Sequence, residues 1–122
     1  MNKERFPDKY AVEEQKENLR GADLSNMSLV DAKLSNADLY GANLSGADLR
    51  CENLSHADLS QAQLVCADLS GADLIGADLF ATNLLGAKLE YADLRGANLR
   101  CQNIDDLKSR GAIIRKMLGV KD

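Results

Sequence analysis

The sequence predicts an all-β solenoid in which the chain turns by about 90° at every fifth residue and so winds into a four-sided prism. Two observations predict this fold class. An apolar residue, almost always Leu, returns at every fifth position from Leu19 to Ile104. The aromatic content is only 4% and Trp is absent, which leaves Leu and Ala to fill the core. Such a core is unusual for an ordinary globular domain and is typical of a repeat architecture.

A period of five fits neither regular element. Eighteen consecutive quintets run from Glu17 to Asp106, each centred on one apolar residue. On an α-helix, steps of five would place successive leucines about 140° apart around the axis, and on a flat strand each odd step would change the face. A turn in each quintet instead directs every centre toward one axis, and four quintets complete a coil. Stacked at about 4.8 Å, the eighteen quintets predict about 4.5 coils.

The other positions of the quintet agree with this geometry. The residue two places before the centre is Ala in thirteen of the eighteen quintets, and we expect it to point inward near a corner. The exceptions at this position are Glu17, Met27, Glu52, Thr82 and Gln102. Asp or Asn usually precedes the centre, where we expect it to hydrogen-bond turn amides. Gly often takes the fifth position, where it eases the backbone around the corner.

The repeats closely resemble the A(D/N)LXX motif of the pentapeptide-repeat family, as in ADLSGADLIGADLF at residues 67–80. The resemblance covers residues 17–106 and implies a right-handed quadrilateral β-helix. The right-handed preference of parallel crossovers supports the same handedness. The resemblance implies no single function, because function resides in sites that vary independently of the fold.

The two flanks of the repeats are expected to close the ends of the β-helix at residues 17–106. Residues 1–16 are expected to form an N-terminal cap, with Pro7-Asp8 as the start of a helix over KYAVEEQKE. Residues 107–122 are expected to form a C-terminal helix or cap, with Asp105 or Asp106 as the N-cap of a helix over LKSRGAIIRKML. Its apolar residues either cover the last coil or join two prisms, as a C-terminal segment does in some family members. These residues are Leu107, Ile113, Ile114, Met117 and Leu118.

Composition argues against several functional classes. No stretch approaches the roughly 20 apolar residues of a membrane span, and the N-terminus lacks the apolar run of a secretory signal, so we expect a cytoplasmic protein without a membrane partner. Cys51, Cys66 and Cys101 form no CxxC pair, and His56 is the single histidine, so we expect neither a metal nor another cofactor. Flat faces of regularly spaced side chains also provide no pocket of converging groups, and we expect no catalytic residues.

Acidic residues of the repeats offer one functional hypothesis. Residues 17–106 hold fourteen acidic and six basic side chains, and residues 107–122 carry a net charge of +4. Stacking by twenty places Asp38, Asp58 and Asp78 in one column. These carboxylates either satisfy turn amides or copy the phosphate spacing of DNA. In the second case the chain is an acidic DNA mimic that binds and modulates DNA gyrase or topoisomerase, an activity that some family members have; it binds no nucleic acid itself.

Apolar side chains in the outward position after the centre offer another hypothesis. The candidate interaction patch consists of Tyr40, Val65, Ile75, Phe80 and Leu85. By the twenty-residue rule, Val65 and Leu85 stack on one face, and Tyr40 and Phe80 lie on the face before it. Such clustering indicates an interaction site or a docking site for the ends of the chain itself. We therefore predict a non-catalytic binding or scaffold module for an unidentified protein partner, with a homodimer through the patch or the C-terminal segment left open.

Overall fold

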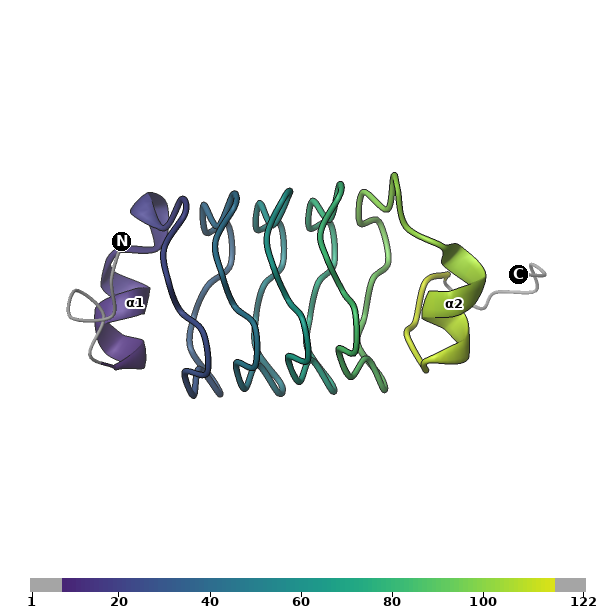
Figure 1. Ribbon diagram of the computed structural model, residues 1–122, viewed down its shortest axis with the longest axis horizontal. Helices are drawn as coiled ribbons and strands as arrows, with labels where there is room; N and C mark the ends of the chain where they lie inside the picture. The colour runs from purple at the N-terminus through teal and green to yellow at the C-terminus, as the bar shows by residue number, and fades with distance from the viewer. Residues whose placement is uncertain (1–7, 116–122) are drawn as a thin grey trace.

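The computed structural model describes residues 8–115 and shows a column of stacked coils with a short helix at each end (Figure 1). Helix α1 spans Lys9–Glu14, the short 3-10 helix η2 spans Lys16–Asn18, and helix α2 spans Ile104–Ser109. The quintets lie between η2 and α2 and form the body of the molecule. The predicted solenoid architecture is therefore present in the described part of the chain.

The coils are joined by single-residue parallel bridges between positions twenty apart, such as Asp23 with Asn43 and Asp78 with Asn98. Each bridge is supported by backbone hydrogen bonds from both sides. Leu24 N donates to Asn43 O at 2.8 Å, and Asn43 N donates to Ala22 O at 2.9 Å. The twenty-residue register predicted from the sequence is confirmed, while the contacts on each face are too short to form extended strands.

The core consists of the centres of the quintets and the alanines before them. Every centre from Leu19 to Leu94 is at most 5% exposed, and every Ala in the position two before the centre is equally buried from Ala22 to Ala92. A fully buried Leu contributes on the order of 2 kcal/mol, so this column of leucines is the main source of stability. Towards the C-terminal end, Leu99 and Ile104 are only half-buried.

Corners of the prism need an unusual backbone conformation. The fifth residue of every quintet from Gly21 to Cys101 has a positive φ, and the values range from 55° to 72°. Gly adopts this region without steric cost, whereas residues with a Cβ do so at a penalty. This explains why Gly recurs at the fifth position, and it places Cys51 and Ala81, both at φ 55°, among the strained corners.

The Asp or Asn before each centre stabilises its own turn, as the sequence predicts. Asp58 Oδ1 accepts a hydrogen bond from Ser60 N at 3.0 Å, and Asn83 Oδ1 accepts one from Leu85 N at 3.1 Å. The acceptor is always the side chain two residues before the donor, the geometry of an Asx turn. The recurrence of Asp and Asn therefore follows from the turn itself.

Helix α1 closes the N-terminal end and begins where the sequence predicts. The Asp8 side chain caps the helix by accepting from Ala11 N at 3.0 Å, and Val12 is completely buried against the first coil. Three charged side chains then bond to backbone groups that a further coil would have paired. Lys9 Nζ donates to Val30 O at 3.1 Å, and Lys16 Nζ donates to Ser35 O at 3.0 Å. Glu13 Oε1 accepts from the backbone N–H of Lys33 at 2.8 Å.

The C-terminal segment differs from the prediction. Helix α2 begins at Ile104, and its N-cap is Asn103, whose side chain accepts from Asp106 N at 3.0 Å; the predicted cap by Asp105 or Asp106 is wrong. Leu107 is buried as the lid on the last coil. The helix ends at Ser109 because Gly111 follows with a φ of 90°.

Beyond Gly111 the chain re-enters the β-helix, so the predicted helix does not continue through Ile113. Ile113 pairs with Asp93, and Ile113 N donates to Ala92 O at 2.8 Å. Ile114 consequently occupies a centre position, twenty residues after Leu94, and is half-buried. The sequence GAIIR thus continues the quintet register that α2 interrupts. The predicted contacts by Met117 and Leu118 lie outside the described residues.

Candidate interaction surface

Four faces of the prism present side chains to solvent, and each is named here by its first centre. The centres are Leu19, Leu39, Leu59, Leu79 and Leu99 on the Leu19 face; Leu24, Leu44, Leu64 and Leu84 on the Leu24 face; Leu29, Leu49, Leu69 and Leu89 on the Leu29 face; and Leu34, Leu54, Leu74, Leu94 and Ile114 on the Leu34 face. The faces follow one another around the axis in this order. Residues just before and just after each centre point outward.

The Leu19 face carries two aromatic residues of the predicted patch, Tyr40 and Phe80. Each ring lies beneath a guanidinium group: Arg20 is 4.8 Å from the centroid of Tyr40, and Arg100 is 5.3 Å from that of Phe80. These are cation–π distances, and the arginine stems cover part of each ring. Ser60 lies at the same position of the intervening coil and is only 7% exposed. The aromatic column is therefore partly covered by its own face.

The Leu24 face carries Val65 and Leu85 at successive levels. Leu85 is 72% exposed, whereas Val65 is half-buried. The corner that joins this face to the Leu19 face holds the small or neutral residues Gln61 and Ala81 at these levels. Val65, Leu85 and Phe80 thus lie around one corner, with Tyr40 further along the Leu19 face beyond Ser60, and we call Tyr40, Val65, Phe80 and Leu85 the corner patch.

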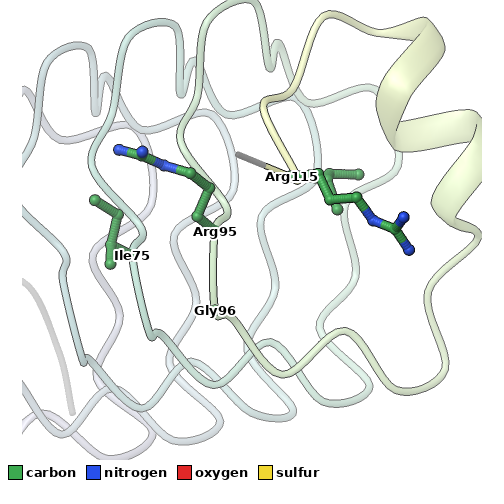
Figure 2. A pocket seen from close by; sticks show the side chains of 5 residues that line it. Ile75, Arg95, Gly96 and Arg115 are labelled. Atoms are coloured by element: carbon green, nitrogen blue, oxygen red, sulfur yellow. The ribbon is translucent and has the colours of Figure 1, made fainter. Parts of the chain in front are cut away.

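Ile75, the fifth residue predicted for the patch, lies elsewhere. It belongs to the Leu34 face, opposite the Leu24 face, and it lines a shallow depression of about 570 Å³ together with Arg95, Gly96, Ile114 and Arg115 (Figure 2). Ile75 adjoins the Leu19 face across the corner at Gly76 but lies opposite Val65 and Leu85, so we describe it separately from the corner patch. The depression is open and is bordered by the re-entrant C-terminal segment.

Beyond Asp23 in its first coil, the Leu24 face is also distinguished by its lack of charge. Between Asn43 and Gly86, all described by the structure, its outward and corner positions hold only amide, hydroxyl, thiol, glycine and aliphatic residues. The amides of Asn83 and Gln63 bond to each other between coils, with Asn83 Nδ2 donating to Gln63 Oε1 at 3.1 Å. This property was missed in the sequence, although reading every fourth quintet together would have revealed it.

On the Leu29 and Leu34 faces, acidic and basic side chains neutralise one another. Arg50 Nη2 lies 2.7 Å from Asp48 Oδ2, and Arg95 Nη2 lies 2.6 Å from Asp93 Oδ2. In each case the hydrogen bond from the arginine lowers the pKa of the aspartate below its usual value. Both aspartates therefore remain ionised, and these two faces present mixed charge.

The predicted acidic column lies on the Leu19 face, where the bridges pair Asp38 with Asp58 and Asp58 with Asp78. Each carboxylate accepts from its own turn amide, for example Phe80 N to Asp78 Oδ1 at 3.0 Å. The two outer members also have neighbours that offset their charge or bond to them. Arg20 Nε lies 2.8 Å from Asp38 Oδ2, and Asn98 Nδ2 donates to Asp78 Oδ1 at 3.1 Å. The column is integrated into the turns of this face.

One buried side chain was not recognised as significant from the sequence. Glu52 takes the inward position that Ala holds in most quintets, it is completely buried, and neither carboxyl oxygen has a hydrogen-bond partner in the described structure. Burial raises its pKa to about 8. The available signal was the exception itself, a carboxylate among alanines at an inward position.

Side chains that could bind a metal are dispersed among residues 8–115. No group of three or more His, Cys, Asp and Glu side chains there is arranged to hold a metal ion. Cys51, Cys66 and Cys101 are free thiols exposed at corners. His56 lies at a corner above Gly76, where its ring fills the space that a Cβ on Gly76 would enter. Within the same residues, no helix has the length and apolar character of a membrane span.

Comparison with known sequences decides the family. The family model described as "Pentapeptide repeats (8 copies)" matches residues 18–50, 53–84 and 64–100. The chain belongs to the pentapeptide-repeat family. A search of curated proteins gives no significant match.

Solved structures of pentapeptide-repeat proteins resemble this one. The protein alr5209 of Nostoc PCC 7120 is 46% identical with a TM-score of 0.71, and the similarity covers 80% of this chain and 79% of that one. Rfr23 of Cyanothece 51142 is 39% identical with a TM-score of 0.60, covering 74% and 61% of the two chains. QnrB1, described as a plasmid-mediated fluoroquinolone resistance protein, is 22% identical with a TM-score of 0.54, covering 80% and 60%; this likeness concerns the fold alone.

Proposed function

We propose that this pentapeptide-repeat protein is a non-catalytic binding module that presents the corner patch to a protein partner. The observation that carries the proposal is that the exposed apolar side chain of Leu85 lies on the part of the Leu24 face, from Asn43 to Gly86, that holds no charged side chain. The cores of protein interfaces are depleted in charged residues and enriched in apolar and aromatic ones. The other faces carry charged residues that suit a solvated surface or a rim.

The rigidity of the scaffold supports the same function. The corner patch is built on coils held by backbone bonds and buried leucines, so its side chains are positioned before a partner arrives. Preorganisation of this kind reduces the entropy lost on binding. The arginines above Tyr40 and Phe80 add groups that are frequent in binding hot spots.

The proposal is tested by capture from a native lysate with a matched pair of double variants. Val65→Ser with Leu85→Ser removes the apolar part of the Leu24 face, and Arg50→Ser with Glu90→Ser changes an equal number of outward positions on the Leu29 face. We expect the first variant to lose the proteins that the wild type retains, and the second to keep them, with both showing the wild-type circular dichroism. Equal capture by all three would refute the patch as the binding surface. Light-scattering mass shows whether the retained partner is a second copy of the chain.

A DNA-mimic function is the alternative, and the geometry favours it less. Asp38 is paired with Arg20, and Arg100 extends over Phe80 at the other end of the same face, so arginines flank the row of three carboxylates on the Leu19 face, whereas a mimic of DNA needs longer rows of free carboxylates. A gyrase supercoiling assay distinguishes the two functions. Inhibition or protection of gyrase at micromolar protein would favour the mimic, and we expect none.

A further inference from the structure

The second coil contains a buried carboxyl group that completes no hydrogen bond in the described structure. Glu52 projects inward on the Leu34 face, between Ala32 of the coil below and Ala72 of the coil above in the twenty-residue register. The residue has no exposed surface, and neither carboxyl oxygen is hydrogen-bonded. A buried ion without a partner costs far more than the neutral acid, so the carboxyl group is held in its protonated form.

Charged groups near Glu52 lie toward the N-terminal end and increase this cost. Glu13 of helix α1 and Asp31 at the corner of the coil below both disfavour its ionisation. The amides of Asn53 and Ala32 act in the opposite sense without completing a hydrogen bond. The coil above offers Ala72, which has no charge. Ionised Glu52 would therefore be repelled by Glu13 of helix α1 and by Asp31 of the first coil.

In the described structure no backbone hydrogen bond joins helix α1 to the first coil. The coils above and below are joined by backbone bonds on every face, such as Leu34 N to Asn53 O at 3.1 Å. Helix α1 has six residues, is anchored by buried Val12, and reaches the first coil through side-chain bonds. One of these bonds is made by a carboxylate that repels ionised Glu52: Glu13 Oε1 accepts a hydrogen bond from Lys33 N at 2.8 Å.

We propose that Glu52 is a proton-dependent lock on the N-terminal end of the β-helix: while its carboxyl group is protonated, helix α1 closes the first coil, and loss of the proton releases α1 from that coil. Release exposes the backbone groups of the first coil that Lys9 and Glu13 of helix α1 occupy. Such an edge is a template for pairing with another strand. The lock therefore couples pH to the availability of one end of the prism.

The direction of the pH dependence follows from the two protonation states. Glu52 has a pKa of about 8 in the closed form, and its ordinary value of 4.5 applies when water reaches it. Closure is strongest below about pH 4.5, weakens as pH rises, and becomes constant above about pH 8. Between pH 5.5 and 7.5 the opening equilibrium is expected to rise by up to roughly 70-fold.

Amide hydrogen exchange of the full chain, resolved to short peptides, tests the lock. The opening equilibrium of residues 8–19 is measured at pH 5.5, 6.5 and 7.5 for the wild type, Glu52→Gln, Glu52→Ala and Glu90→Gln. Glu52→Ala restores the residue that most quintets have and is expected to fold, and Glu90→Gln removes an exposed carboxylate as a control. Comparison at equal pH removes the intrinsic pH dependence of exchange.

We expect the protection of residues 8–19 to fall with pH in the wild type and in Glu90→Gln, relative to both Glu52 variants, by at least tenfold over this range. Residues 57–80 should remain protected in all four proteins, because the release is local. A pH profile of residues 8–19 that is the same in wild type and both Glu52 variants would overturn the proposal. Loss of protection at residues 8–19 and 57–80 together would overturn it as well, since that result indicates global unfolding.

Discussion

Arg110 Nη1 donates to Ala87 O at 2.8 Å and takes the place of a backbone amide that a further coil would supply. One coil earlier, the equivalent carbonyl of Ala67 accepts from Lys88 N at 2.9 Å. The same Nη1 also donates to Leu84 O at 2.9 Å. The Arg110 side chain thus satisfies the carbonyl of Ala87, which the end of the β-helix would leave unpaired, and adds a second hydrogen bond to Leu84 O, which also accepts from Ala87 N at 3.1 Å.

Replacing Arg110 should therefore destabilise the C-terminal end. Arg110→Ala leaves two partly buried carbonyls without this donor, and we expect a loss of about 1–3 kcal/mol in the free energy of unfolding by urea denaturation. Arg50→Ala is the control, because Arg50 pairs only with its own exposed turn, and little change is expected there. Equal stabilities of Arg110→Ala and Arg50→Ala would contradict the capping role.

Glu52 makes the global stability depend on pH in a defined direction. Because its pKa is raised to about 8 in the folded chain, the wild type should lose stability as pH rises from about 4.5 to 8. Glu52→Ala should remove that loss, so it is expected to be more stable than the wild type at pH 8, by an amount that opening of α1 limits to at most about 4 kcal/mol, and similar to it at pH 5. Urea unfolding at both pH values measures the difference.

Two outcomes of the same experiment would contradict this role of Glu52 ionisation. An increase in stability on Glu52→Ala that is equal at pH 5 and pH 8 would mean that packing, and not ionisation, determines the effect of Glu52. A decrease at both pH values would mean that the carboxyl group has a partner that the described structure does not contain.

Asp58 separates the two interpretations of the acidic column. Its Oδ1 accepts from Ser60 N at 3.0 Å and from Ser60 Oγ at 2.6 Å. Asp58→Asn retains an acceptor and removes the charge, whereas Asp58→Ala removes both. If the column serves the turns, Asp58→Asn should keep the wild-type thermal midpoint and Asp58→Ala should lose about 1 kcal/mol. Similar losses in the two variants would indicate that the charge itself matters.

Corner strain gives a stabilising substitution. Ala81 has a φ of 55° at a position where other quintets have Gly. Ala81→Gly should raise the free energy of unfolding by up to about 1 kcal/mol, because Gly adopts this region freely. Ala62→Gly, at a buried inward position, is the matched control and should lower it. Calorimetry of both variants measures the change in the free energy of unfolding. Destabilisation by Ala81→Gly would show that the corner is not strained.

The sequence was sufficient for the parts of the molecule that repeat. Spacing alone predicted the twenty-residue register, the inward leucines and the Asx turns, because each of these features is imposed on every quintet. The N-cap at Asp8 was also predictable, since the capping interaction is local. Helix α2 was misplaced, because Asn103 and Asp106 both look like caps. The pairing of Ile113 with Asp93 was missed because it depends on a contact with a residue twenty positions earlier, and no local signal in GAIIR indicates it.

The candidate surface was predictable only in part. The twenty-residue rule placed Val65 above Leu85 and Tyr40 in line with Phe80, but exposure depends on side chains from other coils. Arg20 and Arg100 cover the two rings, and that arrangement is set by side-chain packing between coils. The state of Glu52 likewise depends on the position of α1 and the first coil.

The most direct test of the central claim, that this chain binds a protein partner through the corner patch, is site-specific photo-crosslinking in a native lysate. A photoreactive phenylalanine analogue replaces either Leu85 on the Leu24 face or Glu90 on the next face, both of which are exposed. We expect a discrete covalent adduct with a partner protein from position 85 and none from position 90. Adducts from position 90 alone, or equal adducts from both positions, would contradict it.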